Sequence, residues 1–224
     1  MKRPYILFLL ICFLCPAVLL AEQRDLEPIL KELDAVIDKK EAYTLPKENE
    51  LSELRMRLKN AKDVRRKYEL CDKLFTGYLH YQADSALAYV ERKEALLPLL
   101  NDPMLEQELI INRAEVMGVM GMYSWAEQLL SQVKPATLTP ALLGYYYRTM
   151  RANYGWFADY LVHTDLKKIY EEKAHVYRDS IMQTPFLSVD DHDIVAAEKL
   201  MMEGETDKAI DVLNRLSGDG TSLR

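Results

Sequence analysis

The sequence predicts an all-α chain, a right-handed solenoid of antiparallel helix pairs with about ten helices, because apolar residues recur mostly at spacings of three and four. The 224 residues include only eight Gly and nine Pro, which is few for a β-rich or disordered protein. One phrase, with Gly followed five residues later by Ala, occurs at residues 120–130 and again at 203–213. Two copies of a helix-hairpin phrase favour stacked helix pairs.

The first residues have the pattern of a secretory signal peptide. Lys2 and Arg3 precede an apolar run over residues 5–21, and a polar segment follows. We expect cleavage after Ala21 and export to the periplasm. The alternative is an uncleaved inner-membrane anchor, because a run of seventeen apolar residues is near the lower limit for crossing a bilayer.

The charge of the mature chain excludes some classes of partner. Removing residues 1–21 removes two of 29 basic residues and no acidic one, which leaves 27 basic against 35 acidic residues, or −8. An acidic chain disfavours binding to nucleic acid or to an anionic membrane. Membrane contact is expected only through an uncleaved signal or a missing C-terminal region. Cys71 is then the single cysteine, and its place on an apolar stripe predicts burial.

The mature chain divides into three predicted parts. Residues 22–62 are expected to form an N-terminal helical hairpin or cap, with a break at 43–46 that places Pro46 in the first turn of the second helix. Residues 63–217 are expected to form helical repeats, and 218–224 a disordered tail. Asp63 and Asp102 are predicted helix caps. Periodicity predicts repeat helices over 63–78, 84–100, 103–121, 123–133, 138–161, 165–183, 189–202 and 206–216.

Small residues at fixed spacing resemble the tetratricopeptide repeat superfamily. In such repeats a small residue at the eighth position meets another at the twentieth, and Gly usually occupies the fifteenth. Two sets match this pattern with identical spacing: Ala114, Gly121 and Ala126, and then Ala197, Gly204 and Ala209. The resemblance implies a TPR-like fold that acts as a protein or peptide-binding module.

A narrower resemblance rests on residues 70–75, 81–87 and 177–180 and would cover nearly all of 22–217. These segments resemble a Bacteroidota family of putative regulators. Its members carry a signal peptide, a TPR-like region, a transmembrane helix and a cytoplasmic domain of unknown function. The resemblance implies the periplasmic sensory part of such a regulator. No later apolar span follows here, so we expect a truncated version, a fragment or loss of the output domain.

The superfamily resemblance also implies a partner-binding groove. First-helix positions that project into the concave groove of TPR proteins correspond here to six residues: Glu108, Glu115, Tyr145, Arg148, Asp191 and Glu198. Tyr and Arg concentrate binding energy at interfaces, which suits a protein or peptide partner. Tyr146, Tyr147, Tyr154 and Phe157 are expected to pack between neighbouring repeats instead.

No pattern in the sequence points to catalysis, a metal or a cofactor, and we expect none. The histidines do not pair at helical ligand spacing. His192 has acidic neighbours, but carboxylates in a first helical turn are explained by capping and the helix dipole. No phosphate loop or nucleophile motif occurs, so we expect that the protein is not an enzyme.

Two other functions stay open. The last helix pair has no helix after it in the sequence, so an exposed apolar edge would support self-association as a homo-oligomer. The aromatic residues of 145–160 would alternatively bind a small molecule or a glycan. That function needs a cavity near Trp156, and a tightly packed Trp156 would exclude it.

Overall fold

The computed structural model describes residues 26–162, 165–184 and 189–218. These residues form helices α2 to α11 and one short 3-10 turn, with no strand among them. They belong to two compact units, which meet in sequence at Glu53 and Leu54 and are treated separately. The predicted signal peptide lies outside the described residues. So does the predicted tail, apart from Gly218, which ends α11. The three-part division of the chain stays a prediction.

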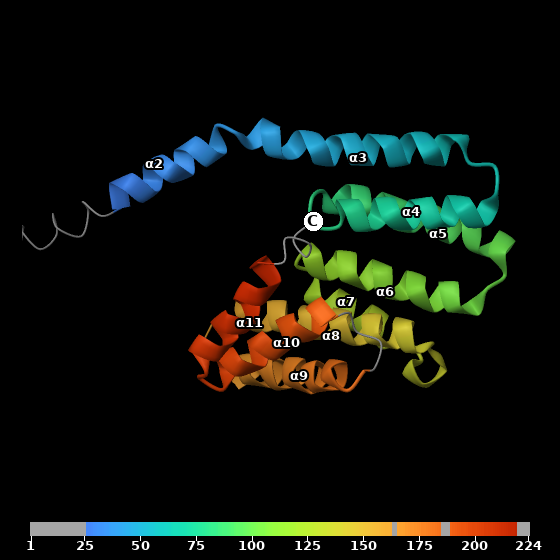
Figure 1. Ribbon diagram of the computed structural model, residues 1–224. Helices are drawn as coiled ribbons and strands as arrows, with labels where there is room; N and C mark the ends of the chain where they lie inside the picture. The colour runs from blue at the N-terminus through green and yellow to red at the C-terminus, as the bar shows by residue number, and fades with distance from the viewer. Residues whose placement is uncertain (1–25, 163–164, 185–188, 219–224) are drawn as a thin grey trace, which may run out of the picture. The chain divides into compact units, whose positions relative to one another are not determined.

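Unit 1 contains α2 (Leu26–Ile37) and most of α3 (Lys40–Asn60), joined by a turn at residues 38–39 (Figure 1). The predicted break at residues 43–46 is wrong, because α3 begins at Lys40 and contains Pro46. Pro46 lies only seven residues into the helix, where a proline removes one backbone bond. The apolar stripe of α2 is exposed at Leu26, Ile29, Leu30, Leu33, Val36 and Ile37.

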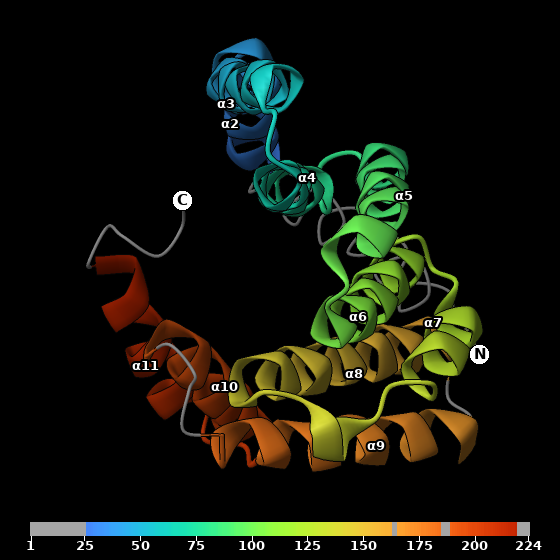
Figure 2. The same ribbon diagram turned by 90° about the vertical axis from the view of Figure 1, so that its right-hand side faces the viewer.

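Unit 2 consists of antiparallel helix pairs. The first helix of each pair lies on the same face of the unit. Each second helix also contacts the first helix of the next pair, and α6 contacts α8 directly. In Figure 2, α4, α6 and α8 follow the inner side of a curve while α5, α7 and α9 lie outside it. This arrangement confirms the predicted all-α, TPR-like class. The pairs are α4 (Val64–Tyr78) with α5 (Ala83–Leu100), α6 (Pro103–Val119) with α7 (Tyr123–Leu130), α8 (Pro140–Tyr160) with α9 (Asp165–Met182), and α10 (Val189–Met202) with α11 (Thr206–Gly218).

Side-chain caps determine where several repeat helices begin. The Asp63 carboxylate accepts a hydrogen bond from the Arg66 amide at 2.8 Å, and Asp102 accepts one from the Met104 amide at 3.0 Å. Both predicted caps are therefore confirmed. Such caps satisfy amides that the first helical turn leaves without a partner.

The repeated turn phrase has the same geometry in both copies. Gly121 and Gly204 each have φ of 79°, a left-handed conformation that only Gly enters without steric cost. One residue later, the amide of Met122 donates to the Met117 carbonyl at 2.8 Å, as the amide of Glu205 does to Leu200 at 2.9 Å. The predicted small residues Ala86, Ala114, Ala126, Ala197 and Ala209 are all buried.

Aromatic residues of α8 pack on both neighbouring layers. Tyr146 and Tyr154 are buried against Tyr177 of α9, with ring centroids 6.3 and 5.7 Å apart. Phe157 stacks on Tyr123 of α7 at 5.2 Å. Phe157 thus packs between neighbouring pairs as expected, and Tyr154 also reaches α7, because its hydroxyl donates to Glu127 Oε1 at 3.1 Å. The ring contacts of Tyr146 lie within its own pair, since α9 is the partner of α8.

A candidate binding groove

A groove of about 650 Å³ runs along the first helices of unit 2. Aromatic, apolar and charged side chains from different helix pairs meet in it. Concave sites with a few polar groups on apolar walls are typical of ligand binding. The lining includes Asp72, Phe75, Leu79 and His80 near α4, Glu108, Asn112 and Glu115 on α6, Leu142, Tyr145, Arg148, Arg151 and Trp156 on α8, and Ile194 and Val195 on α10.

The structure brings together most of the residues that the resemblance singled out. Glu108, Glu115, Tyr145 and Arg148 all line the groove. Glu198 instead lines a smaller neighbouring pocket of about 320 Å³, where it forms an ion pair with Arg151. The side chain of the sixth residue, Asp191, lies outside the described part of the chain. A role for these side chains in partner binding stays a prediction.

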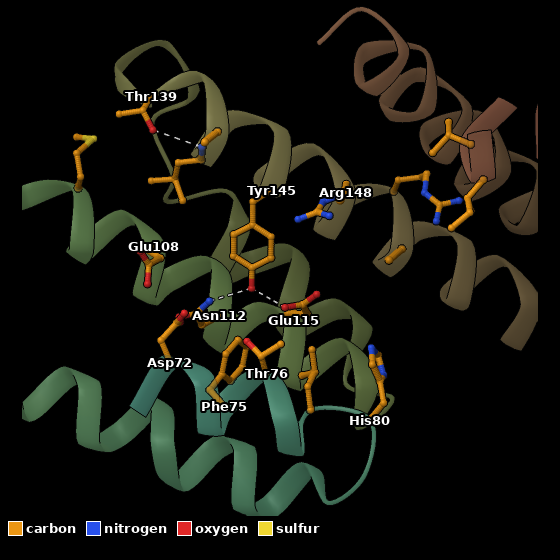
Figure 3. Close-up of a pocket in the computed structure, with 18 of the residues that line it drawn as sticks. Asp72, Phe75, Thr76, His80, Glu108, Asn112, Glu115, Thr139, Tyr145 and Arg148 are labelled. Carbon is orange, nitrogen blue, oxygen red and sulfur yellow. Dashed lines mark hydrogen bonds between the residues drawn. The ribbon is translucent and has the colours of Figure 1, made fainter. Parts of the chain in front are cut away.

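Tyr145 crosses from α8 to α6 at the centre of the groove (Figure 3). Its hydroxyl accepts a hydrogen bond from Asn112 Nδ2 at 2.8 Å and donates one to Glu115 Oε2 at 2.5 Å. Burial raises the pKa of Tyr145 well above its ordinary value, and the Glu115 carboxylate adds to that shift. The phenol is therefore neutral at physiological pH and is held by hydrogen bonds on both sides.

Burial also raises the pKa of Glu115 above its ordinary value. The hydrogen bond from Tyr145 opposes this shift, as do the more distant charges of His80 and Arg148. The Arg148 guanidinium lies over the Tyr145 ring, 5.8 Å from its centroid. Glu115 is thus a half-buried carboxylate in the groove with incomplete charge compensation.

Lys93 lies behind the groove floor and holds its polar side chains in place, although the sequence patterns did not single it out. This α5 side chain is fully buried. Its Nζ donates to Asp72 Oδ1 at 2.5 Å, Glu108 Oε1 at 2.7 Å and Asn112 Oδ1 at 2.6 Å. The superfamily pattern directs attention to first helices, whereas Lys93 is on a second helix. Its position three residues after Val90 on the buried face of α5 was the available signal.

The groove also reaches Trp156, so there is open space beside this residue. The indole is half-buried and lines the groove, with the His80 ring edge-on at 6.5 Å. Gly118 permits this placement, since a Cβ there would lie 3.1 Å from Trp156 Cζ3. Trp156 is therefore not tightly packed. Tight packing is the observation that would have excluded a small ligand.

Other chemistry has little support in the described residues. Among them, no group of three or more His, Cys, Asp or Glu side chains is arranged to hold a metal ion. Cys71 is buried as predicted, and burial raises the pKa of its thiol, which lowers its reactivity. Within residues 26–162, 165–184 and 189–218, no helix has the length and apolar character needed to span a membrane.

Comparison with known proteins gives one family. The family described as the SusR N-terminal TPR domain matches residues 37–221, which is most of the chain. Searches of curated proteins and of solved structures gave no match.

Proposed function

The chain belongs to the family of the SusR N-terminal TPR domain, a family of non-catalytic helical interaction modules, and from that premise we propose that its groove binds an extended segment of a partner protein. The observation that carries the proposal is Tyr145. Its ring stands in the groove with the hydroxyl fixed between Asn112 and Glu115. A rigid, partly buried tyrosine gives contact area with little loss of conformational entropy on binding.

We further propose that the protein is exported and is the periplasmic sensory part of a membrane-spanning regulator. The support is the basic, apolar and polar succession at residues 1–27 together with the family match. Amino-terminal sequencing of the protein after expression with its own leader tests the first step. A chain that starts at Glu22 agrees with export, whereas a chain that retains residues 1–21 contradicts cleavage.

Affinity capture from an envelope extract tests partner binding by the groove. Wild type should retain a partner that is lost with Tyr145→Ala and with Arg148→Glu. The control is Glu91→Gln, an exposed position on α5 outside the groove lining. Equal capture by wild type and both groove variants, or no partner above background, would refute the proposal.

A second candidate is the binding of a small molecule or glycan in the same groove. The half-buried Trp156 and Tyr145 give the cavity two aromatic surfaces, which suit the flat faces of small ligands. Titration of Trp fluorescence with a panel of neutral oligosaccharides tests this candidate. A saturable change that disappears in Trp156→Leu supports it, and no change with any member of the panel argues against it.

Self-association has a separate observation in its favour. Ile210 and Leu213 of α11 and Met201 of α10 are exposed apolar side chains on the last helix pair described. Such a surface can pair with a second copy. Sedimentation velocity of the mature protein measures this directly, and a monomer at all concentrations rules out the homo-oligomer.

A further inference from the structure

We propose that the groove recognises its partner segment through a lysine or arginine side chain placed against Glu115. This inference rests on the proposed function and names the chemistry of the partner. It follows from hydrogen bonding, charge and packing along the wall that α4 and α6 form.

The first step is the hydrogen-bonding capacity of the wall. Lys93 and Tyr145 use one oxygen of each lining carboxylate: Oδ1 of Asp72, Oε1 of Glu108 and Oε2 of Glu115. No hydrogen bond within the described part of the chain reaches the second oxygen of these three groups. Carboxylates only accept, so the wall presents acceptors to the groove. A matching ligand must therefore supply donors.

The second step is charge. Asp72, Glu108 and Glu115 contribute three negative charges to this wall, and Lys93 contributes one positive charge, which leaves −2. On the facing helix α8, Arg151 is paired with Glu198, and Arg148 adds one positive charge that acts on Glu115 from a distance, so the balance around the wall stays negative at −1. In the described residues no ion pair within 4 Å reaches Glu115. A neutral hydroxyl would donate a hydrogen bond to a carboxylate oxygen but would leave the negative charge uncompensated. An ammonium or guanidinium group donates the hydrogen bond and also compensates the charge. A cationic side chain is thus the better complement.

The third step is the apolar surface beside the carboxylate. Gly118 lies one helical turn after Glu115 and is the surface on which Trp156 packs. The indole therefore stands next along the groove, and Phe75 and Leu79 add apolar lining. Lysine and arginine bury their methylene stems on such surfaces and attract aromatic faces with their charged ends.

Selection of displayed random peptides on the mature protein tests the inference. Groove-dependent peptides are those that bind wild type but not Tyr145→Ala. We expect them to share a Lys or Arg residue. Replacing that residue with Gln should weaken the Kd at least about tenfold, as should Glu115→Gln in the protein, and added salt should weaken binding. The Gln side chain can still accept the hydrogen bond from the Tyr145 hydroxyl. Circular dichroism checks that the Glu115→Gln variant is folded. Glu91→Gln is the matched control and should leave the Kd unchanged.

The outcomes separate the inference from the proposed function. Groove-dependent peptides without a basic residue, or a Kd unaffected by Glu115→Gln, overturn the cationic partner while peptide binding by the groove stands. A selection that yields no groove-dependent peptide overturns both.

Discussion

Replacing Lys93 with Met is the most informative perturbation of the groove floor. Lys93 is fully buried, and its ammonium is the only cation that Asp72 and Glu108 contact among the ion pairs of the described residues. Removing one member of a buried charge cluster costs about 3–5 kcal/mol, because the remaining charges lose their compensation. The side chains of Asp72 and Glu108 keep 44% and 26% exposure, so water can partly hydrate them. We therefore expect the lower end, about 3 kcal/mol.

Thermal and urea unfolding followed by circular dichroism measure this effect. For a unit of this size, about 3 kcal/mol corresponds to a fall of roughly 6–12 °C in Tm. Lys73→Met on the exposed face of α4 is the control, with an expected change within about 0.5 kcal/mol. Adding Asp72→Asn and Glu108→Gln to Lys93→Met should restore much of the loss, because no net charge then remains in the cluster.

Either of two results would contradict a stabilising role for the Lys93 charge. A loss below about 1 kcal/mol for Lys93→Met would show that hydration of the two carboxylates already offsets the missing ammonium. A triple variant as unstable as the single variant would show that packing around Lys93, rather than charge, is what the substitution disturbs.

Three further predictions concern other positions. Ala126→Leu overpacks a fully buried contact between α6 and α7 and should destabilise the fold by about 1–3 kcal/mol; unchanged thermal stability would show that the repeat register is wrong. Gly118→Leu should push the indole of Trp156 into the groove and red-shift its emission in a Trp125→Phe background, so an identical spectrum contradicts the packing. Glu115 has a raised pKa, so the folded state binds its proton more tightly and loses stability as pH rises above the ordinary value of 4.5. Glu115→Gln should therefore raise Tm at neutral pH, and that gain should disappear below pH 4.5; a gain independent of pH would contradict the raised pKa.

The sequence alone determined features that depend on nearby residues. Helix starts at Asp63 and Asp102 follow from local capping, and the turns at Gly121 and Gly204 follow from the conformations open to Gly. The break predicted near Pro46 was wrong because α3 continues through this proline despite the backbone hydrogen bond that it removes, and the local pattern does not decide whether a helix continues.

The groove was accessible to sequence reasoning only in part. Glu108, Glu115, Tyr145 and Arg148 were found because each occupies a fixed position in a repeated first helix. Glu198 lines the neighbouring pocket instead of the groove. Its ion pair with Arg151 of α8 depends on how two helix pairs stack, which the sequence pattern does not give.

Tertiary structure decided the chemistry of the groove floor. Lys93 meets Asp72 across 21 residues of sequence, and Asn112 meets Tyr145 across 33. Periodicity indicates which face of a helix is apolar, but it does not indicate which charged side chain on one helix reaches a partner on another. That choice depends on the separation and rotation of the packed helices. The cluster behind the groove and the incompletely compensated Glu115 in it therefore exist only once the pairs have stacked.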